Sequence, residues 1–246
     1  HVPLNHGAAG DDGVYLADSD GGPRRLLMSF ADLAAALPGL PASGTGDFYG
    51  FHLKYNPQGT RIMLVLRWKP RDGGRLQNNV VTLSADGTEP HVAIPHTVWT
   101  VKGGHHPNWQ PDGEHVMMNL NTQGEGMRFI QALHDGSDYR EMHPDILGSG
   151  HPTLHPDGRH ILTDAYQHES MTHEDGSTPI RWADLHTGEV KEIVRARTRP
   201  LFKGAKSERR VDPHPAWDFD YRYAVFNACP QGKRAVFLAD LAGLLD

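Results

Sequence analysis

Four stretches of the sequence share one template, in which a histidine precedes a tight turn at the same spacing. They are residues 51–59 (FHLKYNPQG), 106–113 (HPNWQPDG), 151–158 (HPTLHPDG) and 214–221 (HPAWDFDY). Aligned on the turn, the four histidines fall in one column: His52, His106, His151 and His214. Repeats spaced by about 45 to 60 residues are typical of propellers and other arrays. Because equivalent positions of successive propeller blades surround one axis, the repeats predict a ring of imidazoles.

Strand patterns follow each histidine box. A β-rich run comes directly after each turn, at residues 61–66, 115–120, 160–164 and 222–227. A third run follows at 80–83, 129–133, 180–184 and 235–240, the same element opens the chain at 13–18, and fourth strands such as 190–194 complete the units. Short strands separated by glycine turns predict an all-β fold, a β-propeller of four-stranded blades. Only residues 29–37 have a helical pattern, which ends at Pro38-Gly39.

The repeats divide the chain into five units within a single propeller domain spanning residues 1–246. Their approximate bounds are 1–47, 48–102, 103–148, 149–210 and 211–246. The first unit has outer strands without a histidine box, and the last has a box but only a stub of a fourth strand. Either the termini share strands to close a compact ring, or the chain is part of a larger ring of about seven or eight blades. We favour the second arrangement, because the start at His1 looks incomplete.

Composition limits the functional classes. The chain has 246 residues, 22% of them charged, and a formal net charge of −6, so nothing indicates a general nucleic-acid binder. The single cysteine, Cys229, excludes an internal disulfide framework. No apolar run approaches the roughly 18 residues of a membrane span. The oligomeric state and the compartment, cytoplasm or periplasm, stay open.

The boxes resemble a known family. The pattern of a histidine box followed by a β run resembles the WD40-like repeats of TolB-like propellers. Within that group, residues 104–109 (GHHPNW) and 211–217 (VDPHPAW) are similar to the oligogalacturonate lyase branch. The resemblance implies a divalent metal, typically manganese, on axial histidines, and cleavage of uronate sugars by β-elimination. The last metal motif of that branch has a glutamine and two histidines, and Asp212 stands here in place of the first of those histidines.

The histidine column is itself a candidate metal site. Neutral imidazole binds zinc, manganese, iron and nickel, and several imidazoles around one axis would form a site for a divalent ion. We therefore predict His52, His106, His151 and His214 as ligands for a metal, with manganese favoured and zinc, iron, nickel or calcium as alternatives. Asp212 lies on the same strand face as His214 and could add a carboxylate. In the alternative interpretation, the histidines are structural and bond to neighbouring backbone.

A basic segment precedes the last box. Residues 195–210 carry seven positive charges against one carboxylate in an acidic protein. A basic loop beside an imidazole ring suits an anionic substrate such as an acidic oligosaccharide. We predict that Lys203, Arg209 and Arg210, together with Arg128, bind its carboxylates. The alternative is a solvated basic loop without a ligand.

β-Elimination also needs groups that move protons. A base must remove the proton next to the carboxylate, and an acid can protonate the leaving oxygen. The candidates are His105, which adjoins the column, and Tyr166 and His168, which follow a predicted strand. The resulting prediction is a metal-dependent lyase-like enzyme acting on uronate oligosaccharides. The alternative is a non-catalytic TolB-like propeller that binds a protein or glycan partner.

Overall fold

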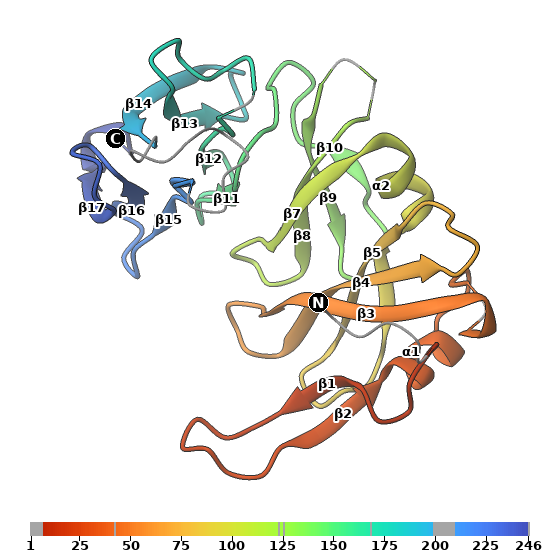
Figure 1. Ribbon diagram of the computed structural model, residues 1–246. Coiled ribbons are helices and arrows are strands. Elements are labelled where there is room, and N and C mark those ends of the chain that lie inside the picture. The colour runs from red at the N-terminus through yellow and green to blue at the C-terminus, as the bar shows by residue number, and fades with distance from the viewer. Residues whose placement is uncertain are drawn as a thin grey trace. The chain divides into compact units, whose positions relative to one another are not determined.

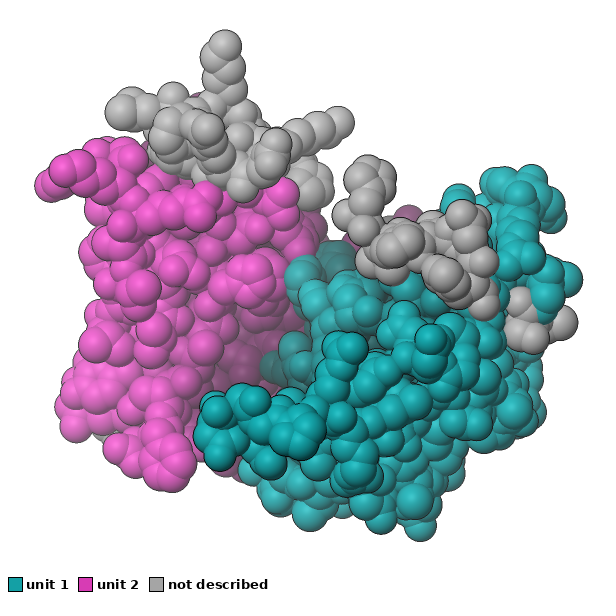
Figure 2. Space-filling view, turned by 60° about the horizontal axis from the view of Figure 1, so that its bottom comes forward, with its two compact units in different colours: residues 1–116, 131–140 teal, residues 117–130, 141–246 magenta. Residues whose placement is uncertain are grey.

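The computed structural model describes residues 7–41, 43–122, 124, 126–167, 169–198 and 210–245. Its elements are short antiparallel strands with few helical segments (Figure 1). Four sheets in the described part of the chain have blade-like strand orders that follow the sequence, and a two-stranded sheet precedes them. This arrangement confirms the predicted all-β β-propeller class. The chain divides into two compact units, residues 1–116 with 131–140 and residues 117–130 with 141–246 (Figure 2).

The first unit begins with a hairpin and contains the first complete blade. The hairpin pairs β1 (Gly13–Leu16) with β2 (Arg25–Ser29), and α1 (Phe30–Ala36) follows directly. The blade has the order β3-β4-β5-β6, formed by β3 (Gly46–Tyr55), β4 (Arg61–Pro70), β5 (Gln77–Ser84) and β6 (His91–Ile94). A short 3-10 turn spans Ser43–Thr45.

One apolar core joins the hairpin, the helix and this blade. Phe30 and Leu33 of α1 are buried with Leu64 and Leu66 of β4. The helix begins here because the Ser29 hydroxyl accepts a hydrogen bond from the Asp32 amide, which satisfies a free N–H of the first turn. The predicted helix at 29–37 is therefore confirmed, with Ser29 as its cap.

A second helix, α2 (His96–Lys102), was not expected from the sequence. It has only seven residues, its cap Pro95 provides no side-chain hydrogen bond, and it is rich in β-branched residues, which have low helix propensity. The Trp99 side chain is buried and its indole N–H donates to the Gly104 carbonyl at 2.8 Å. Tertiary packing thus stabilises a helix that local propensity does not predict.

The next sheet has the order β10-β9-β8-β7. Its strands are β7 (Gly104–Trp109), β8 (His115–Leu120), β9 (Arg128–Leu133) and β10 (Arg140–Glu141). β8 has the bounds predicted from the sequence, because the Pro-Asp-Gly turn fixes its start.

The second unit contains two further blades. The order β11-β12-β13-β14 comprises β11 (Thr153–Leu154), β12 (His160–Thr163), β13 (Ser177–Asp184) and β14 (Val190–Arg197). The order β15-β16-β17 comprises β15 (Ala216–Trp217), β16 (Tyr223–Ala228) and β17 (Ala235–Asp240), and a 3-10 turn spans Ala242–Leu244. Leu162, Ile180 and Trp182 are buried together with Ala224 and Phe226, which joins the two sheets through one core.

The turns between the first two strands of each blade explain the repeated sequence. In residues 155–160, Gly158 has φ 69°, a conformation that favours glycine, and the Asp157 carboxylate accepts the backbone N–H groups of Arg159 and His160. Burial alone would raise the pKa of Asp157, but these hydrogen bonds and one from the His160 ring outweigh it and lower the pKa to about 2. The last turn departs from the template, because Tyr221 adopts φ 57° where the other turns have glycine.

No helix of the described residues is long and apolar enough to cross a membrane.

Candidate functional site

The backbone at the histidine column is unusual. His52, His106 and His214 all have left-handed φ angles, of 54°, 55° and 46°. Non-glycine residues in this region typically cost about 1–3 kcal/mol each, and such residues cluster at functional sites. At His52 the cause is visible, because the pairing of β3 with β4 shifts register between Phe51 and Lys54. Three of the four histidines in the column therefore stand on a left-handed backbone, and His52 does so at a bulge.

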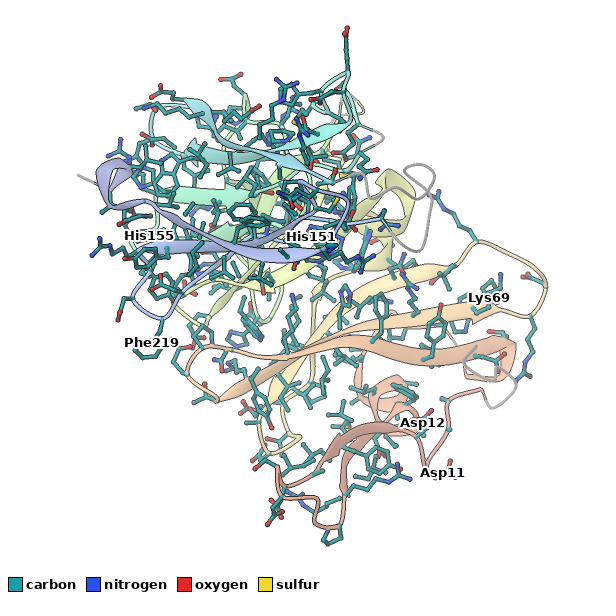
Figure 3. The ribbon with its side chains drawn as sticks, turned by 60° about the vertical axis from the view of Figure 1, so that its left-hand side comes forward. Asp11, Asp12, Lys69, His151, His155 and Phe219 are labelled. Carbon is teal, nitrogen blue, oxygen red and sulfur yellow. The ribbon has the colours of Figure 1, made fainter. Side chains whose placement is uncertain are left out.

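Two of the four predicted histidines meet within the second unit. The rings of His151, labelled in Figure 3, and His214 are stacked with centroids 3.3 Å apart and planes at 27°. A donor nitrogen of each lies within 4.8 Å of one on the other. His151 is buried and His214 is exposed. Two imidazoles this close form part of a metal site if both present lone pairs to one ion.

A buried carboxylate holds both of these histidines. Asp164 accepts the backbone N–H of His151 at 2.7 Å and that of His214 at 2.9 Å. Its oxygens also lie 2.9 and 3.0 Å from Nδ1 of the His151 ring. Burial alone would raise the pKa of Asp164, but these hydrogen bonds and the nearby imidazole outweigh it and hold the pKa below its usual range. Asp164 is therefore a carboxylate at neutral pH.

Tyr166 and Arg210 adjoin the same histidine pair. The Tyr166 hydroxyl is 3.4 Å from Nε2 of His151, and the Arg210 guanidinium lies 5.9 Å from the centre of the Tyr166 ring. Burial, followed by the charges of Asp212 and Asp164, raises the pKa of Tyr166, so its phenol keeps its proton. Two predicted site residues thus lie beside His151 and His214.

Asp212 is paired with Arg210. The Arg210 Nε donates to both carboxylate oxygens of Asp212 at 3.0 Å, and this pairing raises the pKa of Arg210. In the described part of the chain, no residue accepts a hydrogen bond from the two terminal nitrogens of Arg210. The role of Asp212 as a metal ligand stays a prediction, and the structure adds that its carboxylate holds Arg210.

The first unit contains a group of three imidazoles of its own. The rings of His52 and His106 are 5.8 Å apart, and those of His105 and His106 are 5.0 Å apart. His52 and His106 thus lie together as the repeat predicted, and His105 adjoins them.

Other predicted residues have different surroundings or lie outside the described residues. Arg128 is buried, and its guanidinium donates to the carbonyl oxygens of Pro144 and Met127 at 2.6 and 3.1 Å. These contacts hold the Arg128 side chain against nearby backbone, and its role in substrate binding stays a prediction. His168, Lys203 and Arg209 lie outside the described residues.

Asp164 was missed as a site residue, although the repeats contain a signal for it. In the aligned second strands its position is occupied by Asn119 and Asn227, and all three are short polar residues in otherwise apolar strands. The Asn119 side chain donates to the Gly150 carbonyl at 2.8 Å, beside His151, and the Asn227 side chain donates to that of Pro213 at 3.4 Å, beside His214. A polar column that supports the histidine boxes could therefore have been found by the same alignment.

The donor set fits a divalent metal. A carboxylate behind the Nδ1 of a histidine is the usual outer partner of a metal-bound imidazole, because it fixes the ring and its tautomer. Asp164 and His151 have this geometry, and His214 stacks beside them. Imidazole ligands suit manganese, iron, zinc or nickel better than calcium, which prefers oxygen.

Comparison with solved structures finds the same fold in oligogalacturonate lyases and in TolB. An oligogalacturonate lyase in complex with manganese matches with a TM-score of 0.55 at 13% identity, covering 91% of this chain and 70% of that one. The oligogalacturonate lyase of Vibrio parahaemolyticus matches with a TM-score of 0.56 at 11% identity, covering 91% and 71%. TolB from Acinetobacter baumannii matches with a TM-score of 0.50 at 11% identity, covering 93% and 57%.

These matches confirm the predicted resemblance at the level of the fold. The chain shares the propeller of TolB and the oligogalacturonate lyases. No family model matches the sequence, and no curated protein sequence matches it. Because a shared propeller does not imply a shared function, activity has to be argued from the site.

Proposed function

We propose that this protein is a metal-dependent enzyme that cleaves an acidic, uronate-containing oligosaccharide by β-elimination. The observation that carries the proposal is the His151–His214 pair, in which a buried carboxylate holds the imidazoles and Tyr166 and Arg210 adjoin them. Similarity of fold to an oligogalacturonate lyase in complex with manganese supports the same chemistry.

The metal would be held by His151 and His214, and the repeat also predicts His106 as a ligand. His106 occupies the same place in its repeat and has the same left-handed backbone as His214. His52 is a candidate fourth ligand on the same grounds. A divalent ion, with manganese favoured, would supply positive charge that stabilises the carboxylate of the substrate as its neighbouring carbon loses a proton.

Arg210 is the proposed carboxylate-binding residue. Its Nε is occupied by Asp212, which leaves the planar edge of its terminal nitrogens for a substrate carboxylate. Lys203 and Arg209 belong to the same basic segment and extend the proposal to further anionic sugar units.

The reaction needs one proton removed and one supplied. The C–H bond next to the carboxylate breaks and its electron pair forms a C=C bond, while the glycosidic C–O bond breaks and the leaving oxygen takes a proton. Tyr166 keeps its proton because its pKa is raised, so we assign it as the proton donor. His105 is the proposed base, with His168 as the alternative.

Metal content and product formation test the proposal separately. Elemental mass spectrometry of the purified protein should find a near-stoichiometric divalent metal, which the double variant His106→Ala/His214→Ala should lose. The matched control His143→Ala/His186→Ala removes two histidines outside the column and should retain it. Protein without metal would contradict the metal site.

The activity is tested on a panel of uronate oligomers, oligogalacturonate included. Ultraviolet absorbance of the unsaturated product should rise with the wild-type protein and not with Tyr166→Phe. Bound metal without any product would reject the lyase and favour a non-catalytic propeller that binds a glycan or protein.

A further inference from the structure

Asp164 contacts the histidine boxes as a hydrogen-bond acceptor, whereas the asparagines at the same position of neighbouring repeats contact them as donors. Asn119 donates to the Gly150 carbonyl and Asn227 to the Pro213 carbonyl, each directly before a histidine. Asp164 instead accepts from two boxes at once, through the backbone N–H groups of His151 and His214. Its side chain is 1% exposed, so these contacts are made away from solvent.

The side-chain amides of Asn119 and Asn227 show that an uncharged group can bind the backbone of a histidine box. Since Asn119 and Asn227 hold their boxes without a charge, a carboxylate at position 164 is not needed only to join neighbouring blades. A buried carboxylate is costly unless it is paired or fully hydrogen-bonded. Asp164 also contacts the imidazole of His151 through both of its carboxylate oxygens.

That contact selects one form of the ring. Both oxygens of Asp164 already accept backbone N–H groups and both lie beside the His151 Nδ1, so this nitrogen is the donor and carries the hydrogen. In a neutral imidazole the lone pair then lies on Nε2. This is the form that can coordinate a metal on the side of the ring away from Asp164.

Packing around Asp164 leaves it little freedom. A Cβ added at Gly150 would lie 2.1 Å from an Asp164 oxygen, and Gly150 itself has φ 61°. The carboxylate is therefore fixed by backbone on the side of the box and by the His151 ring.

We propose that Asp164 is a positioning residue that fixes the Nδ1–H tautomer of His151 and aligns His151 with His214 for a divalent cation. The cation part rests on the function proposed above. The tautomer and the alignment stand on the contacts within the second unit and can be tested without metal.

The first experiment measures the tautomer directly. In metal-free protein labelled with 15N-histidine, two-bond proton–nitrogen correlations should show Nδ1–H for His151 in the wild type at neutral pH. The isosteric variant Asp164→Asn should lose this preference. Asn227→Ala is the matched control, because it removes the corresponding bond beside His214 without contacting an imidazole, and it should leave the His151 pattern unchanged. A wild-type His151 with hydrogen on Nε2 would overturn the proposal without use of any variant.

The second experiment titrates Mn²⁺ into the same proteins by calorimetry. Asp164→Asn should weaken binding by about 10- to 100-fold, as expected for an outer partner of a metal-bound histidine, and Asn227→Ala should bind like the wild type. Equal affinities in the wild type and Asp164→Asn would overturn the positioning role. Wild-type protein that has the Nδ1–H tautomer but binds no Mn²⁺ would reject the proposed function and leave the tautomer assignment intact.

Discussion

A left-handed backbone at His214 leads to a prediction about stability that opposes the usual effect of glycine. His214 has φ 46°. An L-residue in this region costs about 1–2 kcal/mol, which glycine does not pay. Glycine adds about 0.4–1 kcal/mol of freedom to the unfolded chain. His214→Gly should therefore be more stable than His214→Ala by about 0.5–1 kcal/mol, or about 1–4 °C in Tm for a chain of this size.

The comparison with alanine isolates the backbone. Both variants lose the imidazole and its stacking on His151, and both retain the N–H that donates to Asp164. Urea unfolding in the presence of a chelator, followed by tryptophan fluorescence, measures the difference directly, since Trp217 lies three residues further along the chain. The same pair of substitutions at His151 is the control: its φ is not positive, so alanine should be at least as stable as glycine there.

If His214→Gly were no more stable than His214→Ala, the left-handed backbone would carry no strain. The argument that the chain keeps a histidine there for its chemistry would then fail. Both variants should lose metal equally, because both lack the ligand. A glycine variant that gains stability while losing metal would identify a residue retained for function.

Three further outcomes follow from individual contacts. Gly150→Ala should lower the free energy of unfolding by about 1–3 kcal/mol because of the left-handed backbone. The clash of the added Cβ with the Asp164 carboxylate should increase this loss, which urea unfolding measures. The pKa of Asp157 is lowered from 3.8 to about 2, so its contribution to stability is present above pH 4 and is lost as the pH falls towards 2. Asp157→Asn should therefore make the free energy of unfolding depend less on pH in this acidic range. If Arg210 binds the substrate carboxylate in the ground state, Arg210→Gln should raise KM for a uronate substrate more than it lowers kcat in steady-state kinetics. An unchanged KM would show that Arg210 does not bind the substrate.

The fold was predictable because the repeat specifies it several times over. The bounds of β8 and β17 agree with the sequence pattern, since each strand is delimited by turn residues whose conformations few other residues adopt. The helix α2 was not predictable, because its residues favour strands locally and it is stabilised by the buried Trp99. Local pattern succeeds where each repeat supplies the same information and fails where one segment depends on packing.

The site was predictable in part for the same reason. The column of histidines follows from alignment of the boxes, and it correctly brings His151 beside His214 and His52 beside His106. The role of Asp164 depends on contacts with two boxes, one of them 50 residues away, which no local pattern contains.

Two features of the site, the left-handed backbone of its histidines and the buried Asp164 carboxylate, bear on whether the propeller is only a scaffold. A scaffold would have no reason to keep histidines in a strained backbone, where glycine costs less, or to bury a carboxylate where asparagine serves neighbouring blades. Both features converge on the His151–His214 pair, and beside it Arg210 is fixed by an aspartate that occupies the place of a ligand in the lyase motif. Under the proposed function, the cation and Arg210 would together neutralise the substrate carboxylate, which is the feature we expect to distinguish this protein from lyases with a full set of histidines.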